Sequence, residues 1–502
     1  MNLKQMLGEV VERYGRKTAI IFGKRRLSYA ELEESSNKVA NALTKLGVSK
    51  GDRVAILLPN SPEFVVTYFG VVKIGGIAVL LDTKYKVSEL ASLFGHCQPK
   101  VLVTDDPYLE PLVSALPRFT SIKQVINVGA NYKGQFVSYS EIMATDLAQG
   151  VGMEIEPEAT AHIAYTSGPT YRPKGVMLPH QDLVTAASIS GDAFQQTDKD
   201  ITILFALPLH HAYGLVVVLL GSLAKGGTVA IMPGLSISSL TELIERERAT
   251  IFMGVPFVFG LVNRFAEEEG LQHDLSSLRL CVSAGARLPP DTVERFRRCY
   301  GLGIIEFWGL TESVGCVTSQ PIDGTGKLGS VGKALPGYKV KVINDEGKEL
   351  PQNQAGELIV SGLMMKGYYG NPQASAATIR DGWLYTGDIG KVDEDGDLSI
   401  IGRKREMIIT KGQNIYPSDI EDVLNTHPKI AEAAVVGVPD EVRGEVVRAA
   451  ISLKEGESIT EQEIIRFCRE YLANYKIPKQ IIFMDSLPKT AAGGIHKEDL
   501  VK

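Results

Sequence analysis

The chain has 502 residues, a formal net charge of −6 and a pI near 5.9. That length allows roughly three to four domain-sized units with cores of their own, and the lack of an overall basic field excludes an electrostatic footprint for nucleic acid. Hydrophobic residues at 44% and charged residues at 22% are ordinary for a globular protein, while 50 glycines exceed the usual share of about 7% and indicate many tight turns.

The cysteines and the apolar runs indicate the redox compartment of the protein and its relation to membranes. The five cysteines are widely spaced and form no CxxC pair, which favours a reduced, cytoplasmic protein without a thiolate metal site. The opening stretch MNLKQMLGEVVERYGRK lacks the apolar segment of a secretion signal, and the longest apolar run, at 212–224, is too short to span a bilayer. We therefore expect no transmembrane segment, and peripheral contact with a membrane stays open.

Short β-branched and apolar runs alternate with helix-length segments through most of the chain. We predict strands at 53–59, 76–82, 100–105, 162–168, 227–233 and 249–256. Each reads as a continuous apolar run, the pattern of a strand covered by helices on both faces. The sequence therefore predicts an α/β fold whose large N-terminal body contains mainly parallel sheets with flanking helices.

The texture changes near residue 400, where a charged, turn-rich stretch leads into a smaller segment. In order, we predict a helix at 418–430 with a Ser or Asp cap, strands at 431–439 and 446–453, a capped helix at 460–472 and a strand at 479–485. These elements predict a small α+β domain of about 100 residues. The predicted division is a large domain at 1–402 and a small one at 403–502.

The stretch YTSGPTYRPKG at 165–175 follows a predicted strand, the setting in which a glycine-rich loop presents amides to phosphate oxygens. It is not a Walker A loop, because the Gly-Lys-Ser/Thr ending is missing. Taken alone, the stretch fits a surface turn with an incidental lysine about as well as it fits a phosphate-binding loop.

Six further segments change that balance. In chain order they are LPLHHAYG (207–214), SAGARLP (283–289), FWGLTES (307–313), GWLYTGD (382–388), GRKREMIITKGQNIYPSDIE (402–421) and LPKTAAGGIHKEDL (487–500). With the loop they resemble the acyl-adenylate-forming superfamily of acyl-CoA synthetases, peptide-synthetase adenylation domains and luciferases, over essentially the whole chain. The resemblance implies ATP, Mg²⁺ and CoA as the small molecules of the reaction, and a small C-terminal domain joined by a hinge.

The resemblance assigns a nucleotide site. It comprises Ser167, Gly168, Thr170, Lys174, Gly285, Ala286, Trp308, Gly309, Thr311, Asp388 and Arg403. Glu312 is implied as the Mg²⁺ ligand, with Thr170 beside it, which suits a hard cation that prefers oxygen. Trp308 would stack on adenine, against the alternative of core packing, and Asp388 would accept the ribose hydroxyls.

A second set is implied for the acyl group and CoA. His211 and Tyr213 would wall the acyl pocket, followed by Gly214, and the small residues Ser283 and Ala284 would leave room for a ligand. The adjacent histidines are more often packing residues than metal ligands, since no further His or Cys cluster completes a zinc site.

Two further positions concern the movement between half-reactions. Gly412 would lie beside the pantetheine arm of CoA, although Lys-Gly turns are common. Arg405 would be the hinge, and the alternative for Arg403 to Arg405 is a solvated basic turn.

The sequence departs from the family pattern at three positions. Gly494 occupies the position of the lysine that, in the family, bridges the substrate carboxylate and the α-phosphate. Lys497 and Lys489 begin roughly 10 Å and 16 Å away along extended chain, too far to substitute. Pro169 removes a backbone donor from the phosphate loop, and Tyr171 stands where the family has glycine.

The predicted function is that of an AMP-forming acyl-CoA synthetase for a medium- or long-chain fatty acid or another hydrophobic acid, with weakened adenylation. The catalytic set is Thr170, Lys174, His211, Glu312 and the position of Gly494. A non-catalytic nucleotide- or acyl-binding homologue and a ligase that loads a carrier protein remain as alternatives. The three departures also fit a chain altered by design to trap one state, and either a monomer or a homodimer is compatible with the sequence.

Overall fold

The computed structural model describes all residues except 133, 167–173, 233, 235, 411–412, 441–443, 473, 491–493 and 502. The chain divides into two compact units. The first comprises Met1–Lys339 and Val360–Leu384, and the second comprises Val340–Ile359 and Tyr385–Lys502. The predicted boundary at 402/403 and the hinge at Arg405 stay predictions; Arg405 itself lies in the 3₁₀ turn Lys404–Glu406.

The first unit contains two large sheets. The nine-stranded sheet has the order β16 (Lys333–Ala334), β15 (Thr318–Ser319), β14 (Ile304–Trp308), β13 (Leu280–Ser283), β12 (Ile251–Gly254), β10 (Ile201–Leu204), β11 (Thr228–Ile231), β1 (Thr18–Phe22) and β2 (Arg25–Ser28). The eight-stranded sheet has the order β19 (Gly367–Tyr368), β9 (Lys174–Pro179), β8 (Thr160–Thr166), β4 (Ile77–Leu80), β3 (Arg53–Leu57), β5 (Val101–Thr104), β6 (Gln124–Asn127) and β7 (Val137–Ser138). The strands from β14 to β1 and from β8 to β7 run parallel to their neighbours, while the edges are antiparallel.

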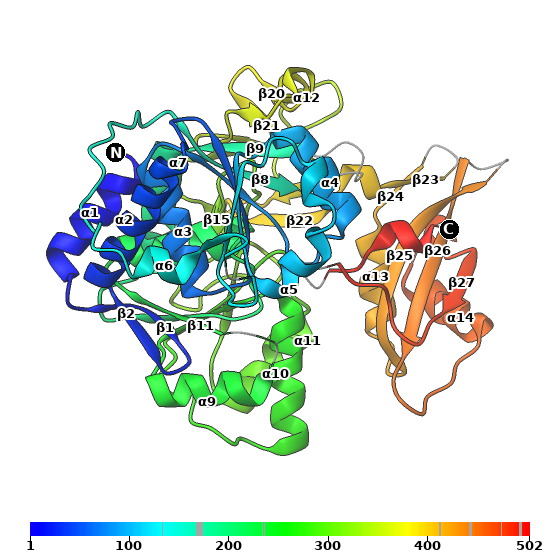
Figure 1. Cartoon of the computed structure of the whole chain (residues 1–502). Helices are drawn as coiled ribbons and strands as arrows, with labels where there is room; N and C mark the ends of the chain where they lie inside the picture. Colours follow the sequence, from blue (N-terminus) through cyan, green and yellow to red (C-terminus); the bar gives the residue numbers. More distant parts are fainter. Residues whose placement is uncertain are drawn as a thin grey trace. The chain divides into compact units, whose positions relative to one another are not determined.

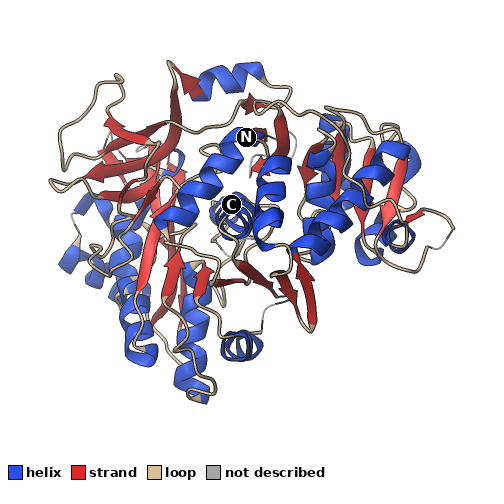
Figure 2. Ribbon diagram, turned by 90° about the vertical axis from the view of Figure 1, so that its left-hand side faces the viewer, coloured by secondary structure: helices blue, strands red, loops and turns tan. Residues whose placement is uncertain are grey.

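Helices flank these strands (Figures 1 and 2). They are α1 (Leu3–Tyr14), α2 (Tyr29–Lys45), α3 (Pro62–Lys73), α4 (Val87–Cys97), α5 (Asp106–Leu109), α6 (Tyr139–Met143), α7 (His180–Ala193), α8 (Gly221–Ala224), α9 (Ile237–Glu247), α10 (Pro256–Glu269), α11 (Pro290–Tyr300) and α12 (Pro372–Thr378). The helices α2 and α3 begin at the polar caps Ser28 and Ser61, and their apolar faces are buried. One core cluster joins the nine-stranded sheet to α9, α10 and α11 through Phe252, Phe259 and Phe296.

Two further sheets complete the fold. The strands β17 (Lys339–Ile343), β18 (Gly356–Ser361), β21 (Trp383–Val392) and β22 (Leu398–Arg403), most of whose residues belong to the second unit, form one sheet together with β20 (Ile379–Arg380). The strands β24 (Gln413–Ile415), β23 (Ile408–Thr410), β26 (Gly444–Leu453), β25 (Ile430–Asp440) and β27 (Gln480–Phe483) form the other, with α13 (Pro417–Asn425) and α14 (Glu461–Tyr471) packed on it through a shared core.

The predicted fold class is confirmed, and all six predicted strands of the large body exist with ends shifted by a few residues. The cap of α14 is the predicted one, since the Thr460 and Glu463 side chains bond each other's backbone N–H groups. The cap predicted for α13 is wrong. That helix begins at Pro417 after Tyr416, which provides no side-chain cap, and the Ser418 hydroxyl instead donates to the Ile401 carbonyl. A proline at the first helical position needs no cap for a missing N–H.

The five cysteines are free thiols. Among the described residues, no helix is both long enough and apolar enough to cross a lipid bilayer.

Candidate active site

Most of the predicted site residues of the first unit lie at one edge of the nine-stranded sheet, where its parallel strands end. The registers align Gly254 with Ser283 and Ser283 with Glu306, so β12, β13 and β14 finish side by side. The loops after β10, β13 and β14 carry residues 207–214, 284–286 and 309–312 of the predicted segments. The carboxyl edge of a parallel sheet is where α/β proteins bind ligands.

The loop after β10 is held by a side chain from the other sheet. Asn60, in the loop after β3, donates from Nδ2 to the Leu207 carbonyl and accepts at Oδ1 from the Leu209 N–H, both at 2.8 Å. Gly214 closes the loop, because a Cβ there would overlap the Pro208 carbonyl. These contacts fix the place of the two histidines between them.

Tyr213 begins a π-helical segment, Tyr213–Leu220, a form that is common at functional sites. Its hydroxyl donates to the carbonyls of Gly254 at 3.3 Å and Val282 at 3.2 Å, and its ring meets the edge of Phe307 at 4.8 Å. Burial raises the pKa of the phenol well above its ordinary value. Tyr213 is therefore a neutral, fixed wall between three strand ends.

The rings of the adjacent His210 and His211 lie against each other, with centroids 4.4 Å apart and planes tilted by 48°. His210 Nε2 lies 3.7 Å from an Asp82 carboxylate oxygen, too far for a hydrogen bond. Burial lowers the pKa of His210 well below 6.5, helped by the neighbouring His211 and Lys84, and burial also lowers the pKa of His211. Both rings are neutral at pH 7. No group of three or more His, Cys, Asp or Glu in the described part of the chain could hold a metal ion.

The end of β13 presents small residues. Ser283 is fully buried, and among the described residues its hydroxyl has no hydrogen-bond partner. Gly285 adopts φ +86°, a conformation that disfavours any side chain, and Ala286 next to it is exposed. A buried hydroxyl without a hydrogen-bond partner lowers the stability of the fold. A polar group of a ligand could form the missing hydrogen bond at this place.

The turn after β14 is tightly closed. Trp308 is 8% exposed and pairs with Thr318 of β15, so its ring is largely enclosed in this structure. A Cβ at Gly309 would overlap the Gly315 carbonyl, and Val314 adopts φ +64°, which is strained for a β-branched residue. Strained backbone of this kind gathers at functional sites.

Glu312 lies in that turn beside Thr311, and both are partly buried. The Tyr368 hydroxyl donates to Glu312 Oε1 at 3.0 Å. Lys174 Nζ lies over the Tyr368 ring, 5.1 Å from its centroid, within the range of a cation–π interaction. Lys174 and Glu312, which are 138 positions apart in sequence, thus meet through a third residue.

Asp388, the predicted ribose contact, and Arg403, predicted as a ribose or phosphate contact, belong to the second unit and lie opposite each other on β21 and β22. Arg403 Nε is 2.6 Å from Asp388 Oδ1, and Asp388 is 2% exposed. The structure therefore brings these two side chains together.

Gly494 also lies in the second unit, and its N–H donates to Thr490 Oγ1 at 3.1 Å. The two lysines nearest in sequence are both ion-paired. Lys489 pairs with Glu432, and Lys497 Nζ lies 2.7 Å from a Glu421 carboxylate oxygen. Neither supplies a ready replacement for the lysine missing at 494.

Some predicted residues lie outside the described part of the chain. They are Ser167, Gly168, Thr170 and Gly412, together with the unusual Pro169 and Tyr171 of the phosphate loop. Their predicted roles stay predictions.

The sequence analysis did not single out Asn60 or Tyr368, although both contact the predicted segments. Asn60 follows a predicted strand, which was a usable signal. Tyr368 carried no signal, because a Tyr-Tyr pair in a turn is unremarkable until the fold places it against Glu312.

Comparison with known proteins decides the family. The description "AMP-binding enzyme" matches residues 7–369, and "AMP-binding enzyme C-terminal domain" matches residues 419–493. The chain belongs to the AMP-binding enzyme family. It is 33% identical to a long-chain-fatty-acid–CoA ligase of Bacillus subtilis (100% of this chain, 94% of the relative) and 34% identical to an indoleacetate–CoA ligase of Aromatoleum aromaticum (96% and 94%).

A solved structure supports the same assignment. ATP-bound MatB from Rhodopseudomonas palustris superposes with a TM-score of 0.91 at 32% identity, covering 100% of this chain and 98% of that one. Members of this AMP-binding enzyme family with such similarity are AMP-forming acyl-CoA ligases, which use a carboxylic acid, ATP and CoA.

The described residues fit one Mg²⁺ ion at Glu312. The side chain offers carboxylate oxygen to a hard cation, and Mg²⁺ in nucleotide sites is usually bound by one or two carboxylates plus substrate phosphates rather than by a protein cage.

Proposed function

We propose that the protein joins a hydrophobic carboxylic acid to CoA through an acyl-adenylate, and that its adenylation half-reaction is slow compared with thioester formation. The single observation that carries this proposal is Gly494, which replaces the family's bridging lysine in a chain that otherwise aligns with its ligase relatives over its whole length. The relatives' names include a long-chain fatty acid and indoleacetate, which supports a hydrophobic acid as substrate class.

In the first half-reaction, a carboxylate oxygen of the acid attacks the α-phosphorus of ATP, and the bond to pyrophosphate breaks. Lys174 contributes positive charge near the phosphates, and Ser167 and Thr170 contribute hydroxyls. Mg²⁺ bound by Glu312 would offset charge on the leaving pyrophosphate. Without a lysine at 494, no fixed cation bridges the two anions, so this barrier is raised.

In the second half-reaction, the CoA sulfur attacks the acyl carbonyl, AMP leaves with the electron pair, and the thiol proton passes to solvent or a base. Trp308 and Asp388 would retain the adenosine, and the aromatic wall of Tyr213 with His211 would retain the acyl chain. None of these roles requires a lysine at 494.

The test supplies the two half-reactions separately. Purified protein receives either acyl-AMP plus CoA or acid plus ATP plus CoA, with fatty and aryl acids in parallel, and thioester is measured. We expect thioester readily from acyl-AMP and weakly from ATP.

Gly494→Lys provides the matched variant. It should raise the ATP route by about 10²- to 10³-fold, the usual size of a lost transition-state charge contact, and leave the acyl-AMP route within a few fold. A Cβ at 494 would meet Thr490 Oγ1 at an ordinary 3.4 Å, so the turn accepts a side chain. Lys497→Ala should change neither route. No thioester from acyl-AMP that nevertheless binds would favour a non-catalytic binding homologue.

A further inference from the structure

Tyr368 occupies a place between the two charged residues that the proposed adenylation step needs. Its ring faces Lys174 and its hydroxyl reaches Glu312. The three residues come from three separate segments of the first unit: the start of β9, the turn after β14 and β19. A single side chain therefore contacts both the ammonium group of Lys174 and the carboxylate of Glu312.

The segment around Tyr368 fixes Glu312 at two points. The Met365 N–H donates to the Glu312 carbonyl at 2.8 Å, and the Tyr368 hydroxyl donates to the carboxylate. Among the described residues, Oε1 is the carboxylate oxygen with a hydrogen bond, so Oε2 is the one that a cation can take. A glutamate that is held by hydrogen bonds at both its backbone carbonyl and its carboxylate loses little conformational freedom when it binds a cation.

Tyr368 is itself rigidly held. The Tyr368 N–H donates to Ser375 Oγ at 2.8 Å, and the next N–H, of Tyr369, donates to the Gly175 carbonyl at 2.7 Å. Tyr368 is 5% exposed, and its hydroxyl donates to the Glu312 carboxylate at 3.0 Å.

We propose that Tyr368 is a positioning residue for the metal–nucleotide complex, which holds the Glu312 carboxylate for Mg²⁺ while its ring supports Lys174 beside the phosphates. This inference rests on the proposed function, since it concerns the same nucleotide site. It adds a residue that touches neither the reacting atoms nor, through its own oxygen, the metal.

The variant Tyr368→Phe tests the hydroxyl alone, because the ring and its contact with Lys174 remain. The matched control is Tyr369→Phe, which removes the same atom from the neighbouring residue, whose ring packs against His96 instead. Glu312→Gln serves as the reference for loss of the metal ligand. Thermal unfolding of each variant separates local effects from loss of the fold.

The readout is binding rather than turnover. Calorimetry measures the affinity for α,β-methylene-ATP, which cannot transfer its AMP group to an acid, with Mg²⁺ and with EDTA. Electron paramagnetic resonance measures Mn²⁺ bound in the presence of the same analogue. In the unmodified protein, the metal should tighten nucleotide binding. Tyr368→Phe should reduce that enhancement about five- to tenfold, the size of one ordinary hydrogen bond, and leave binding in EDTA and AMP binding unchanged. Tyr369→Phe should leave all of these values unchanged.

Three results would overturn the inference, and they differ in what they say about the function. An undiminished metal enhancement in Tyr368→Phe, with Glu312→Gln impaired, rejects the role of Tyr368 and leaves the function standing. An equal loss with and without metal shows that the hydroxyl serves the fold. Failure of the unmodified chain to bind ATP, AMP or acyl-AMP rejects the proposed function itself, and the inference with it.

Discussion

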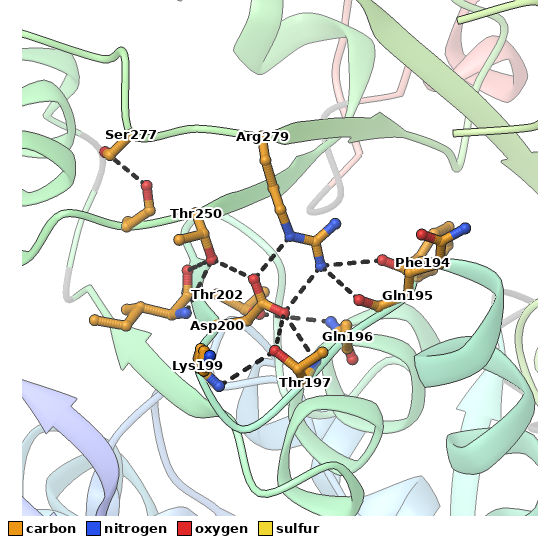
Figure 3. Close-up of polar contacts among 12 residues, drawn as sticks. Phe194, Gln195, Gln196, Thr197, Lys199, Asp200, Thr202, Thr250, Ser277 and Arg279 are labelled. Carbon is orange, nitrogen blue, oxygen red and sulfur yellow. Dashed lines mark hydrogen bonds and ion pairs between the residues drawn. The ribbon is translucent and has the colours of Figure 1, made fainter. Parts of the chain in front are cut away.

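Two buried carboxylates on the same sheet differ in their hydrogen-bond partners and in the direction of their pKa shifts. Asp200, 5% exposed, precedes β10 at the amino edge of the nine-stranded sheet, and Glu306, 6% exposed, lies near the carboxyl edge on β14. Figure 3 shows Asp200 surrounded by donors: Arg279 Nε and Nη2 at 2.8 and 2.9 Å, Thr250 Oγ1 at 2.7 Å, and the backbone and hydroxyl of Thr197. Glu306 accepts from the Leu288 N–H at 3.3 Å.

The pKa shifts follow from those surroundings. Burial, the largest effect at Asp200, would raise its pKa, but the bonds from Arg279, Thr250 and Thr197 together lower it. Burial raises the pKa of Glu306 to about 7, against weaker lowering by the Leu288 N–H and the Arg287 charge. At the amino edge, the hydrogen bonds of Asp200 are satisfied and stabilise the fold. At the carboxyl edge, Glu306 and Ser283 have few hydrogen-bond partners among the described residues, in the region where a ligand would bind.

The largest expected effect is at the amino edge. Asp200→Ala leaves Arg279 without its carboxylate and should lower the free energy of unfolding by about 3 kcal/mol, the low end for a broken buried pair because Arg279 is about one-third exposed. Urea unfolding followed by tryptophan fluorescence measures this change, since Trp308 and Trp383 both lie in the first unit. Nucleotide affinity below the transition should not change.

A matched control is Asp192→Asn. Asp192 pairs with Lys225, but its side chain is 72% exposed, so the loss should stay below about 1 kcal/mol. Equal losses in the two variants would mean that burial of the Asp200 network has no special weight.

The next effect has the opposite sign and depends on pH. Between pH 4.5 and about 7 the unfolded chain releases the Glu306 proton while the folded protein keeps it, so stability falls as pH rises through this range. Glu306→Gln removes that cost and should stabilise the protein by about 2 to 3 kcal/mol at pH 8 and by almost nothing at pH 4. Urea unfolding at both pH values measures it.

Asp200 gives the reverse dependence. Because its folded pKa is lowered below 3.8, its contribution is complete above pH 3.8 and disappears as pH falls through the folded pKa. The difference in stability between the wild type and Asp200→Ala should therefore narrow only in strong acid. A pH-independent gain in Glu306→Gln would contradict the contrast between the edges.

A smaller effect is expected when one hydroxyl is removed from the satisfied edge. The Thr250 hydroxyl donates to Asp200 and accepts from the Ile201 N–H at 3.1 Å. Thr250→Val keeps the shape but leaves that N–H unpaired, and should cost about 1 to 2 kcal/mol of unfolding free energy. The same urea titration detects it.

The smallest effect should come from the other edge. Ser283→Ala removes a buried hydroxyl that has no partner among the described residues, together with its desolvation cost, so the free energy of unfolding should rise by up to about 1 kcal/mol. Affinity for the acid substrate is the quantity to follow in parallel. A loss as large as that of Thr250→Val would show that the Ser283 hydroxyl has a structural role.

The sequence predicted those parts of the molecule whose cause is local. Apolar runs such as 53–59 and 249–256 became β3 and β12 because a strand buried on both faces needs continuous apolar residues. The motifs led to His211, Ser283 and Glu312, and the fold brings their segments to one edge. Long-range partners could not be predicted: Asp200 and Arg279 are 79 positions apart, and Tyr368 follows Glu312 by 56. Nothing in local composition encodes which strand starts become neighbours.

Asn60 couples the motions of two loops that belong to different sheets. Its side-chain amide forms hydrogen bonds with the backbone of Leu207 and Leu209, as a neighbouring strand would. These two bonds connect the loop after β3 to the loop after β10. Neither loop can open without breaking both bonds, which couples local unfolding of one sheet's rim to that of the other. The Leu209 amide proton therefore exchanges with deuterium only when its hydrogen bond to Asn60 breaks. Its exchange rate reports how often the two loops open together in the first unit.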